Sequence, residues 1–402
     1  MLSVVGGGPI GLAIAWRSAL RGRTVTVYDP EPGSGASAVA AGMLSPVSEA
    51  AFGERELTPL LLDSAARWPA FAAELAVATG RDLGHRTEGT LIVALTADDA
   101  AEARRLWTYQ RDLGLPLEPL LPGQLREREP ALNPRVRAGA YAPGDHQVDP
   151  RRLVPALLDA ALGAGVTLVR RPVARLADLP AGPVVVAAGT GTAALTGLPI
   201  RPVKGQVLRL RAPGGAGPAI RHVLRGHADG RSVYLVPRTD GEVVVGATVE
   251  ERVDRTVTAG AVLDLLRAAT ELVPELAEYE LVEARAELRP GTPDNLPVLG
   301  PLPTPAGGRH GVAVAGGHGH VPVAGGHGHV PVAGGHGHVL VAGGHYRHGI
   351  VLTPVTADLI ADALTGQGPP DALAAFRPDR FSVPTHRPEP ARPAAEGANS
   401  WR

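Results

Sequence analysis

The clearest chemical signal in the sequence is a group of glycines near its start. Gly6, Gly8 and Gly11 match the pattern G-x-G-x-x-G, and Asp29 follows them. In this pattern the first glycine permits a tight turn, the second lets the backbone approach a pyrophosphate, and the third lets a helix pack closely on a strand. The carboxylate of Asp29 can accept both hydroxyls of an adenosine ribose. These residues predict a dinucleotide site, and an acid at this position favours FAD or NAD over NADP.

The elements that must position this motif are a strand, a helix and a second strand. Residues 2–5 form a short apolar run suited to a buried strand, and apolar residues recur at helical spacing over residues 10–20. Residues 24–28 read as the second strand, which ends at Asp29. The start of the helix offers free N–H groups to phosphates. A glycine turn without a ligand is the alternative, but the flanking elements are those that the dinucleotide motif requires.

Composition limits the remaining classes of function. The chain has 402 residues, enough for two domains, and its 39 basic and 40 acidic residues give no reason to expect nucleic acid or an anionic membrane as a partner. It has no cysteine, which excludes disulfides, thiolate metal sites and a flavin attached through cysteine. No long apolar run predicts a membrane span, and no signal peptide precedes the first strand, so we expect a cytoplasmic protein. Its oligomeric state stays open, with a homo-oligomer as one option.

The order of the elements predicts an α/β fold in which a parallel sheet is combined with an inserted antiparallel sheet. Strands are expected at residues 89–95, 167–169 and 183–188, and helices at 58–79, 98–113 and 149–162. Antiparallel strands are expected at 203–211, 232–236 and 242–248, whereas 116–143 reads as a turn-rich segment. We therefore predict a discontinuous Rossmann-like cofactor domain (1–84, 146–203 and 285–382) and a substrate domain (85–145 and 204–284). Residues 383–402 are predicted to be a disordered tail.

A tandem repeat interrupts the last part of the cofactor domain. Three nine-residue copies of the type GHVPVAGGH lie between Gly319 and His345, and a weaker copy precedes them. Pairs such as His318 and His320 raise the alternative of a metal site, but no carboxylate or third ligand accompanies each pair, so we expect no metal. Proline lacks the N–H that a central strand donates, and the last copy is both free of proline and contiguous with the sequence that follows. We therefore predict that residues 339–342 form the core strand and that 310–338 are extruded.

Several blocks of the sequence together resemble the D-amino-acid-oxidase-like flavoproteins, and within them the glycine oxidases of thiamine biosynthesis. The most specific are AAGML, LRPGTPD and GHYRHGI, and further matches include PVKGQ and DHQVDPRRL. The resemblance implies FAD, bound non-covalently, in a Rossmann-like FAD-binding domain with an antiparallel substrate domain. It implies that FAD meets the following residues: Gly6, Gly8, Pro9, Ile10, Gly11, Asp29, Pro30, Ala36, Ser37, Ala41, Gly42, Met43, Val173, Gly189, His345, Tyr346, Arg347, His348, Gly349, Ile350 and Val351.

The same resemblance implies a site for an amino acid. Arg289 and Arg347 match positions that hold the substrate carboxylate, and an arginine fork suits a planar carboxylate. Tyr234 matches an active-site tyrosine, although a tyrosine at the rim of a sheet is the plain alternative. Two positions depart from the pattern or leave it open. Many relatives have glycine where Glu287 stands, so its side chain either faces solvent or crowds the site, and Val249 leaves the preferred amine undecided.

The activity that the resemblance implies is oxidative deamination. Glycine, sarcosine or D-alanine would be converted to the imine with oxygen as the acceptor and hydrogen peroxide as a product, and the glycine imine would serve thiazole formation. A D-amino-acid or sarcosine oxidase is the alternative within the family. An NAD-dependent dehydrogenase and an inactive, histidine-rich metal-binding descendant are the alternatives outside it.

Overall fold

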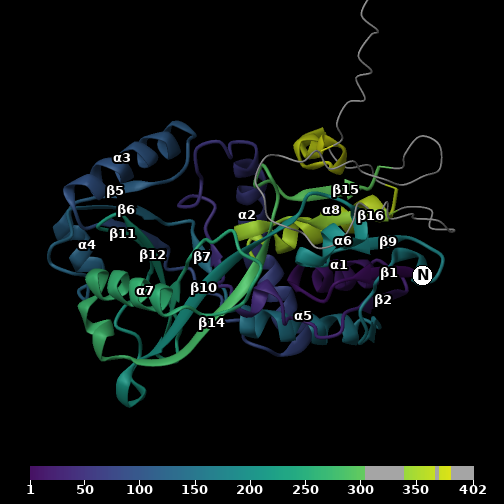
Figure 1. The fold of residues 1–402 in the computed structure, drawn as a ribbon, viewed down its shortest axis with the longest axis horizontal. Coiled ribbons are helices and arrows are strands. Elements are labelled where there is room, and N and C mark those ends of the chain that lie inside the picture. Colours follow the sequence, from purple (N-terminus) through teal and green to yellow (C-terminus); the bar gives the residue numbers. More distant parts are fainter. Residues whose placement is uncertain (304–338, 367–370, 382–402) are drawn as a thin grey trace, which may run out of the picture.

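The computed structural model describes residues 1–303, 339–366 and 371–381, and these form two large sheets that lie toward opposite ends of the molecule (Figure 1). The first sheet has six strands and is mostly parallel. Its strands, in spatial order, are β15 (Val298–Pro301), β16 (Val339–Gly343), β9 (Val184–Val186), β1 (Leu2–Val5), β2 (Val25–Tyr28) and β8 (Thr167–Val169). Its central strands are buried along their whole length, which explains their continuous apolar sequence.

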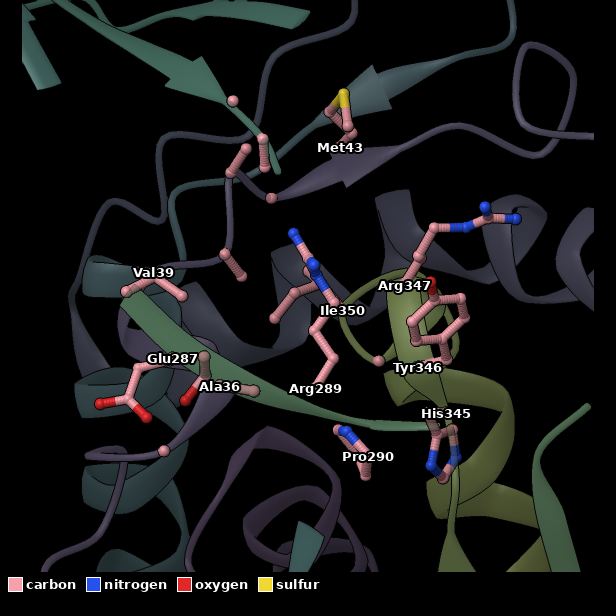
Figure 2. Close-up of a pocket in the computed structure, with 18 of the residues that line it drawn as sticks. Ala36, Val39, Met43, Glu287, Arg289, Pro290, His345, Tyr346, Arg347 and Ile350 are labelled. Carbon is pink, nitrogen blue, oxygen red and sulfur yellow. The ribbon is translucent and has the colours of Figure 1, made fainter. Parts of the chain in front are cut away.

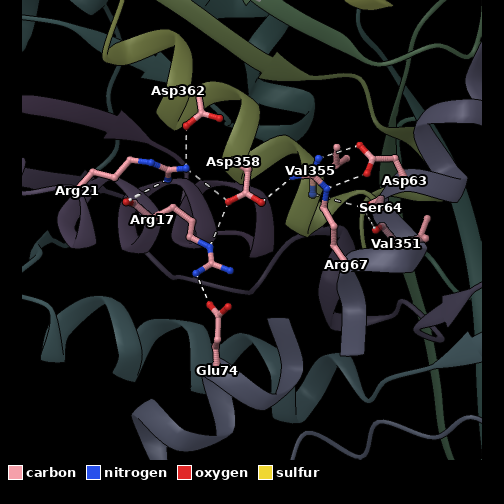
Figure 3. Close-up of polar contacts among 10 residues, drawn as sticks. All are labelled: Arg17, Arg21, Asp63, Ser64, Arg67, Glu74, Val351, Val355, Asp358 and Asp362. Atoms are coloured by element: carbon pink, nitrogen blue, oxygen red, sulfur yellow. Dashed lines mark hydrogen bonds and ion pairs between the residues drawn. The ribbon is translucent and has the colours of Figure 1, made fainter. Parts of the chain in front are cut away.

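Four long helices pack against this sheet and one another. They are α1 (Pro9–Leu20), α2 (Leu57–Thr79), α5 (Pro150–Gly163) and α8 (Thr353–Leu364), and the short α6 (Thr192–Thr196) lies nearby. Asp358 on α8 is the centre of the polar contacts between them (Figure 3): Arg67 of α2 donates to it at 2.9 Å, and Arg17 of α1 lies 3.4 Å away. The Ser64 hydroxyl of α2 donates to the carbonyl of Val351 at 2.6 Å. These contacts hold the turn before α8 in place.

The second sheet has eight strands and is mostly antiparallel. Its strands, in spatial order, are β14 (Glu280–Gly291), β10 (Arg201–Arg211), β13 (Glu242–Gly246), β12 (Arg231–Pro237), β11 (Val223–Ala228), β4 (Thr90–Ala94), β6 (Ala138–Ala142) and β5 (Glu118–Leu120). Helix α7 (Ala259–Leu272) covers one face, α3 (Ala97–Asp112) covers part of the other, and α4 (Pro122–Arg128) lies near β6. A two-stranded ribbon, β3 (Met43–Leu44) with β7 (His146–Gln147), completes the strands of the described residues.

This architecture confirms the predicted fold class, and it differs from the sequence expectation in several places. The segment 116–143 is more than turns, because β5, α4 and β6 lie in it. Four of the five residues of its strand β6 are alanine or glycine, and Gly139 packs closely against Leu125 of α4, so tertiary packing supports a strand that the local sequence does not indicate. Helix α2 begins at Leu57 rather than at residue 58, and β13 ends at Gly246 rather than at residue 248.

The strand expected from the last repeat is confirmed. Strand β16 pairs in parallel with β9 and antiparallel with β15, so it lies within the first sheet. Residues 310–338, which we expected to be extruded, and the tail at 383–402 fall outside the described residues. The domain boundaries stay a prediction, since two of them (203/204 and 284/285) fall inside β10 and β14, the long strands that extend between the two halves of the molecule.

Among the helices of the described residues, none is both long and apolar enough to cross a membrane.

Candidate active site

Residues from both sheets line one cavity of about 700 Å³ (Figure 2). Its size lies within the range of small-molecule sites. Most of the residues predicted from the sequence meet there: Gly6, Gly8, Pro9, Ile10, Asp29, Pro30, Ala36, Ser37, Ala41, Gly42, Met43, Gly189, Tyr234, Arg289, His345, Tyr346, Arg347, Gly349 and Ile350. The cavity therefore joins the glycine motif to the residues expected to hold a substrate.

Three glycines shape the end of the cavity beside α1. Gly6 has a φ of +116°, and a Cβ atom there would lie 2.2 Å from the carbonyl oxygen of Ala187. A Cβ on Gly11 would lie 2.0 Å from the carbonyl oxygen of Gly6, so this glycine brings the helix against the strand. Gly8 differs from both, because no protein atom lies within 4 Å of the place where its Cβ would be. The space beside Gly8 is thus open to a ligand.

The same end of the cavity offers donors and acceptors that suit a dinucleotide. Gly8 is the N-cap of α1 and supplies no side-chain cap, so the first N–H groups of the helix face the open space. The Asp29 carboxylate accepts hydrogen bonds from the backbone N–H of Gly7 at 2.6 Å and of Glu31 at 2.8 Å. A carboxylate has about four acceptor positions, so Asp29 can still receive ribose hydroxyls. The open glycine turn, the free helix start and the carboxylate fit the adenosine diphosphate part of FAD.

Four predicted cofactor residues do not line the cavity. Gly11 acts on the packing of α1, and Val173 packs against the cluster around Tyr28. His348 is buried beside Glu49, with its Nδ1 atom 3.2 Å from that carboxylate. The carbonyl of Val351 faces α2, where it accepts hydrogen bonds. These four residues pack next to the lining of the cavity and do not themselves face the cavity.

The eight-stranded sheet forms the opposite wall, and two glycines in it make room for two large side chains. The guanidinium of Arg289 on β14 lies over Gly205 of β10, where a Cβ would come within 2.3 Å of it. The ring of Tyr234 on β12 lies over Gly246 of β13 in the same way, again at 2.3 Å. A glycine inside a strand often marks such a close approach. Gly205 and Gly246 are therefore the signal in the sequence that could have located these two side chains.

Four arginines line the cavity, and three of them have a carboxylate partner. Arg225 pairs with Glu49, Arg255 with Glu287, and Arg347 with Glu54. Within the described residues Arg289 forms no ion pair, and its Nη1 donates to the carbonyl oxygen of Thr248 at 3.1 Å. A guanidinium that is partly buried and has no counter-ion is an attractive site for a carboxylate ligand.

Arg347 and Arg289 do not converge in this structure. Figure 2 shows the Arg347 guanidinium directed away from Arg289, and the Nη2 atom of Arg347 lies 3.2 Å from both oxygens of Glu54. The side-chain amide of Asn295 also donates to Glu54, at 3.2 Å. Sequence reasoning missed Glu54, because nothing local connects it to a residue almost three hundred positions away. The two arginines expected to hold the substrate carboxylate therefore differ in this structure: Arg289 has no carboxylate partner among the described residues, and Arg347 is neutralised by Glu54.

Three buried groups near the cavity have displaced pKa values: Glu49, His345 and Tyr234. Burial by itself raises the pKa of Glu49, but the charge of Arg225 and a hydrogen bond from His348 together hold it below its ordinary value. Burial, together with the neighbouring His348, lowers the pKa of His345 to about 3. His345 is therefore neutral at physiological pH, and its Nε2 lies 3.1 Å from the Thr356 hydroxyl. Burial also raises the pKa of Tyr234, so its hydroxyl keeps its proton.

Comparison with known proteins gives the family of the chain. Residues 2–363 match the family model described as FAD dependent oxidoreductase. The chain is 34% identical to the glycine oxidase of Geobacillus kaustophilus, over 93% of this chain and 95% of that protein. It is 32% identical to the bifunctional protein ThiO/ThiG of Synechocystis sp., over 96% of this chain but only 54% of that protein.

A solved structure supports the same assignment at the level of the fold. The crystal structure of the Geobacillus kaustophilus glycine oxidase superimposes with a TM-score of 0.77 at 33% identity, and the match covers 96% of this chain and 98% of that one. The family match spans the glycine motif, both sheets and the turn before α8. The chain therefore belongs to the FAD dependent oxidoreductases and uses FAD as its cofactor.

Proposed function

We propose that this protein is a glycine oxidase, which converts glycine and other small amines such as sarcosine and D-alanine to the imine, with oxygen as the acceptor and hydrogen peroxide as a product. The observation that carries the proposal is Arg289: it is the one cavity-lining arginine of the described residues without a carboxylate partner. A substrate with a single carboxylate supplies the missing partner. The similarity to glycine oxidases and to a ThiO/ThiG protein supports glycine as the substrate and the supply of its imine for thiazole formation in thiamine biosynthesis.

The side chains on the eight-stranded sheet would bind and orient the amino acid. Arg289 receives the carboxylate as a planar fork, and the protonated Tyr234 hydroxyl stands beside it as a hydrogen-bond donor. FAD, held by the glycine turn and the start of α1, would supply the redox chemistry between the amine and oxygen, so the protein itself contributes mainly position and electrostatics. No metal and no catalytic histidine are needed, and neutral His345 is suited to support the turn rather than to transfer a proton.

The test is the visible absorbance spectrum of the purified holoenzyme before and after glycine is added without oxygen. We expect the protein to be yellow, glycine to bleach it, and air to restore the colour with formation of peroxide. A panel of glycine, sarcosine, D-alanine and larger D-amino acids then ranks the substrates. A yellow protein that only a larger D-amino acid bleaches would replace glycine oxidase by D-amino-acid oxidase, and a colourless protein would overturn the proposal.

A further inference from the structure

Residues 248–255 follow β13 and run beside β10, and we call this segment the strap. It begins with a backbone pairing to β10: the N–H of Lys204 donates to the carbonyl of Glu250 at 2.9 Å, and the N–H of Glu250 donates back at 3.0 Å. The Thr248 hydroxyl also accepts from the N–H of Gln206 at 3.0 Å. The first half of the strap is therefore tied to the strand that carries Gly205.

A buried lysine anchors the middle of the strap. Lys204 is the only lysine in the chain, and its side chain is fully buried. Its Nζ donates to Asp254 at 2.8 Å and lies 3.8 Å from Glu250. A fully buried ammonium is costly unless it is paired, so these two carboxylates belong to the folded arrangement of the strap.

Both ends of the strap contact β14. At its start the carbonyl of Thr248 accepts the hydrogen bond from Arg289. At its end Arg255 donates to Glu287 at 2.7 Å, and the two side chains differ greatly in exposure, at 57% for Arg255 and 9% for Glu287. Glu287 and Arg289 are two residues apart on β14. The strap and β14 thus form a closed ring of contacts that includes the free guanidinium.

The position of Glu287 shows how it can affect Arg289 without touching it. Figure 2 shows the Glu287 carboxylate directed away from the Arg289 guanidinium, so the two side chains do not pair. The nearest described cations to Glu287 are Arg255 and Arg285, the latter at 3.7 Å. Arg289 takes its orientation from the Thr248 carbonyl and from the space over Gly205. Whatever holds the strap in register therefore also orients Arg289.

We propose that Glu287 is a positioning residue: through Arg255 and the strap, it holds the Thr248 carbonyl where this carbonyl orients the Arg289 guanidinium for a carboxylate. The inference rests on the proposed function, because it assigns Arg289 the substrate carboxylate. It gives the buried Glu287 side chain a task at the site, in place of the two alternatives of facing solvent or crowding the pocket. Loosening the strap weakens carboxylate binding while the FAD cradle on the other sheet stays intact.

The experiment compares five holoenzymes: wild type, E287Q, R255Q, R255K and E251Q. Arg255 is exposed, so its variants keep the proposal testable even where E287Q folds poorly. R255K keeps the charge that pairs with Glu287. E251Q is the matched control, because Glu251 lies on the strap but pairs with Arg201, and both of these side chains are exposed. Acetate, a carboxylate that the enzyme cannot oxidise, is titrated by the change in flavin absorbance, and KM and kcat for glycine are measured beside FAD retention.

We expect R255Q and E287Q to weaken acetate binding and to raise the KM for glycine by the same factor, about fivefold, the scale of a partly exposed ion pair. The kcat at saturating glycine and FAD retention should stay at the wild-type level. R255K should recover most of the affinity, and E251Q should match the wild type.

Acetate affinity at the wild-type level in R255Q would overturn the positioning role. A parallel loss of acetate affinity, kcat and FAD in both variants would overturn it too, because that pattern indicates general destabilisation. A wild-type holoenzyme that acetate does not perturb and glycine does not reduce would instead overturn the proposed function and, with it, the role of Glu287. In the first two outcomes the wild-type enzyme still oxidises glycine. A failure of the positioning role can therefore be told apart from a failure of the proposed function.

Discussion

The two walls of the cavity are built in different ways. The part of the cofactor wall described above comes from a continuous stretch, Gly6 to Asp29, and is mostly backbone: a glycine turn and the start of a helix, joined by one side-chain carboxylate. The substrate wall takes Arg289 and Tyr234 from strands far apart in the chain, and each lies over a glycine of a neighbouring strand. The backbone conformation of one short segment forms the cofactor wall, whereas the register between neighbouring strands positions the side chains of the substrate wall. Substitutions in the cofactor wall should therefore affect FAD binding, whereas substitutions in the substrate wall should affect the turnover of glycine.

The largest effect is expected at Gly8 of the cofactor wall. Apart from its chain neighbours, no protein atom lies within 4 Å of the position of its Cβ, so we expect the side chain in G8V to extend into the space for the ligand. The protein should fold with the thermal midpoint of wild-type apoprotein and be purified colourless, as measured by calorimetry and flavin absorbance. G11A provides the contrast, because its Cβ clashes with the Gly6 carbonyl and should lower the midpoint as well. A yellow G8V protein would contradict the proposed place of the pyrophosphate.

The next effect is expected at Arg289 of the substrate wall. R289A should keep its FAD and its yellow colour but lose about a hundredfold or more in kcat/KM for glycine, because no other cavity arginine is free to hold the carboxylate. R289K should lose less, since lysine keeps the charge but not the fork. Steady-state kinetics with the FAD content of each variant distinguish the two walls. Equal loss of FAD and of glycine turnover would remove Arg289 from its role.

The same difference explains what the sequence predicted. The glycine motif, the βαβ unit and the strand at residues 339–342 could be predicted because each rests on a local pattern of glycine, proline or apolar residues. The ion pair between Arg347 and Glu54 could not, because it joins distant segments that no spacing rule relates. Strand β6 was missed because its alanines and glycine carry no local strand pattern, and the strand depends on pairing with β4 and packing against α4. Arg289 was found through a resemblance, and its lack of an ion pair became visible only when the structure paired the three other arginines of the cavity with carboxylates.

A smaller effect is expected at Gly205 of the substrate wall, the glycine over which the Arg289 guanidinium lies. A Cβ on residue 205 would lie 2.3 Å from the Arg289 guanidinium, and the flexible end of that side chain can move away at little cost. G205A should therefore keep its stability and FAD but raise the KM for glycine about tenfold, because a displaced fork meets the carboxylate poorly. G217A is a matched control, since Gly217 is exposed and a Cβ there meets no other atom. A KM for G205A equal to that of G217A would show that Arg289 does not need the space above Gly205.

The smallest effect is expected at Arg347, the arginine that the sequence placed on the substrate and the structure pairs with Glu54. Because Glu54 already neutralises it, R347A should lower kcat/KM for glycine by less than about fivefold, the scale of a partly exposed ion pair. E54Q keeps the acceptor for Asn295 but frees Arg347, so it should strengthen the binding of dicarboxylates such as malonate while glycine changes little. Both effects are measured by steady-state kinetics and by flavin titration with acetate and malonate. If R347A instead proves as damaging as R289A, Arg347 must leave Glu54 during catalysis, and the substrate wall would then include the turn before α8.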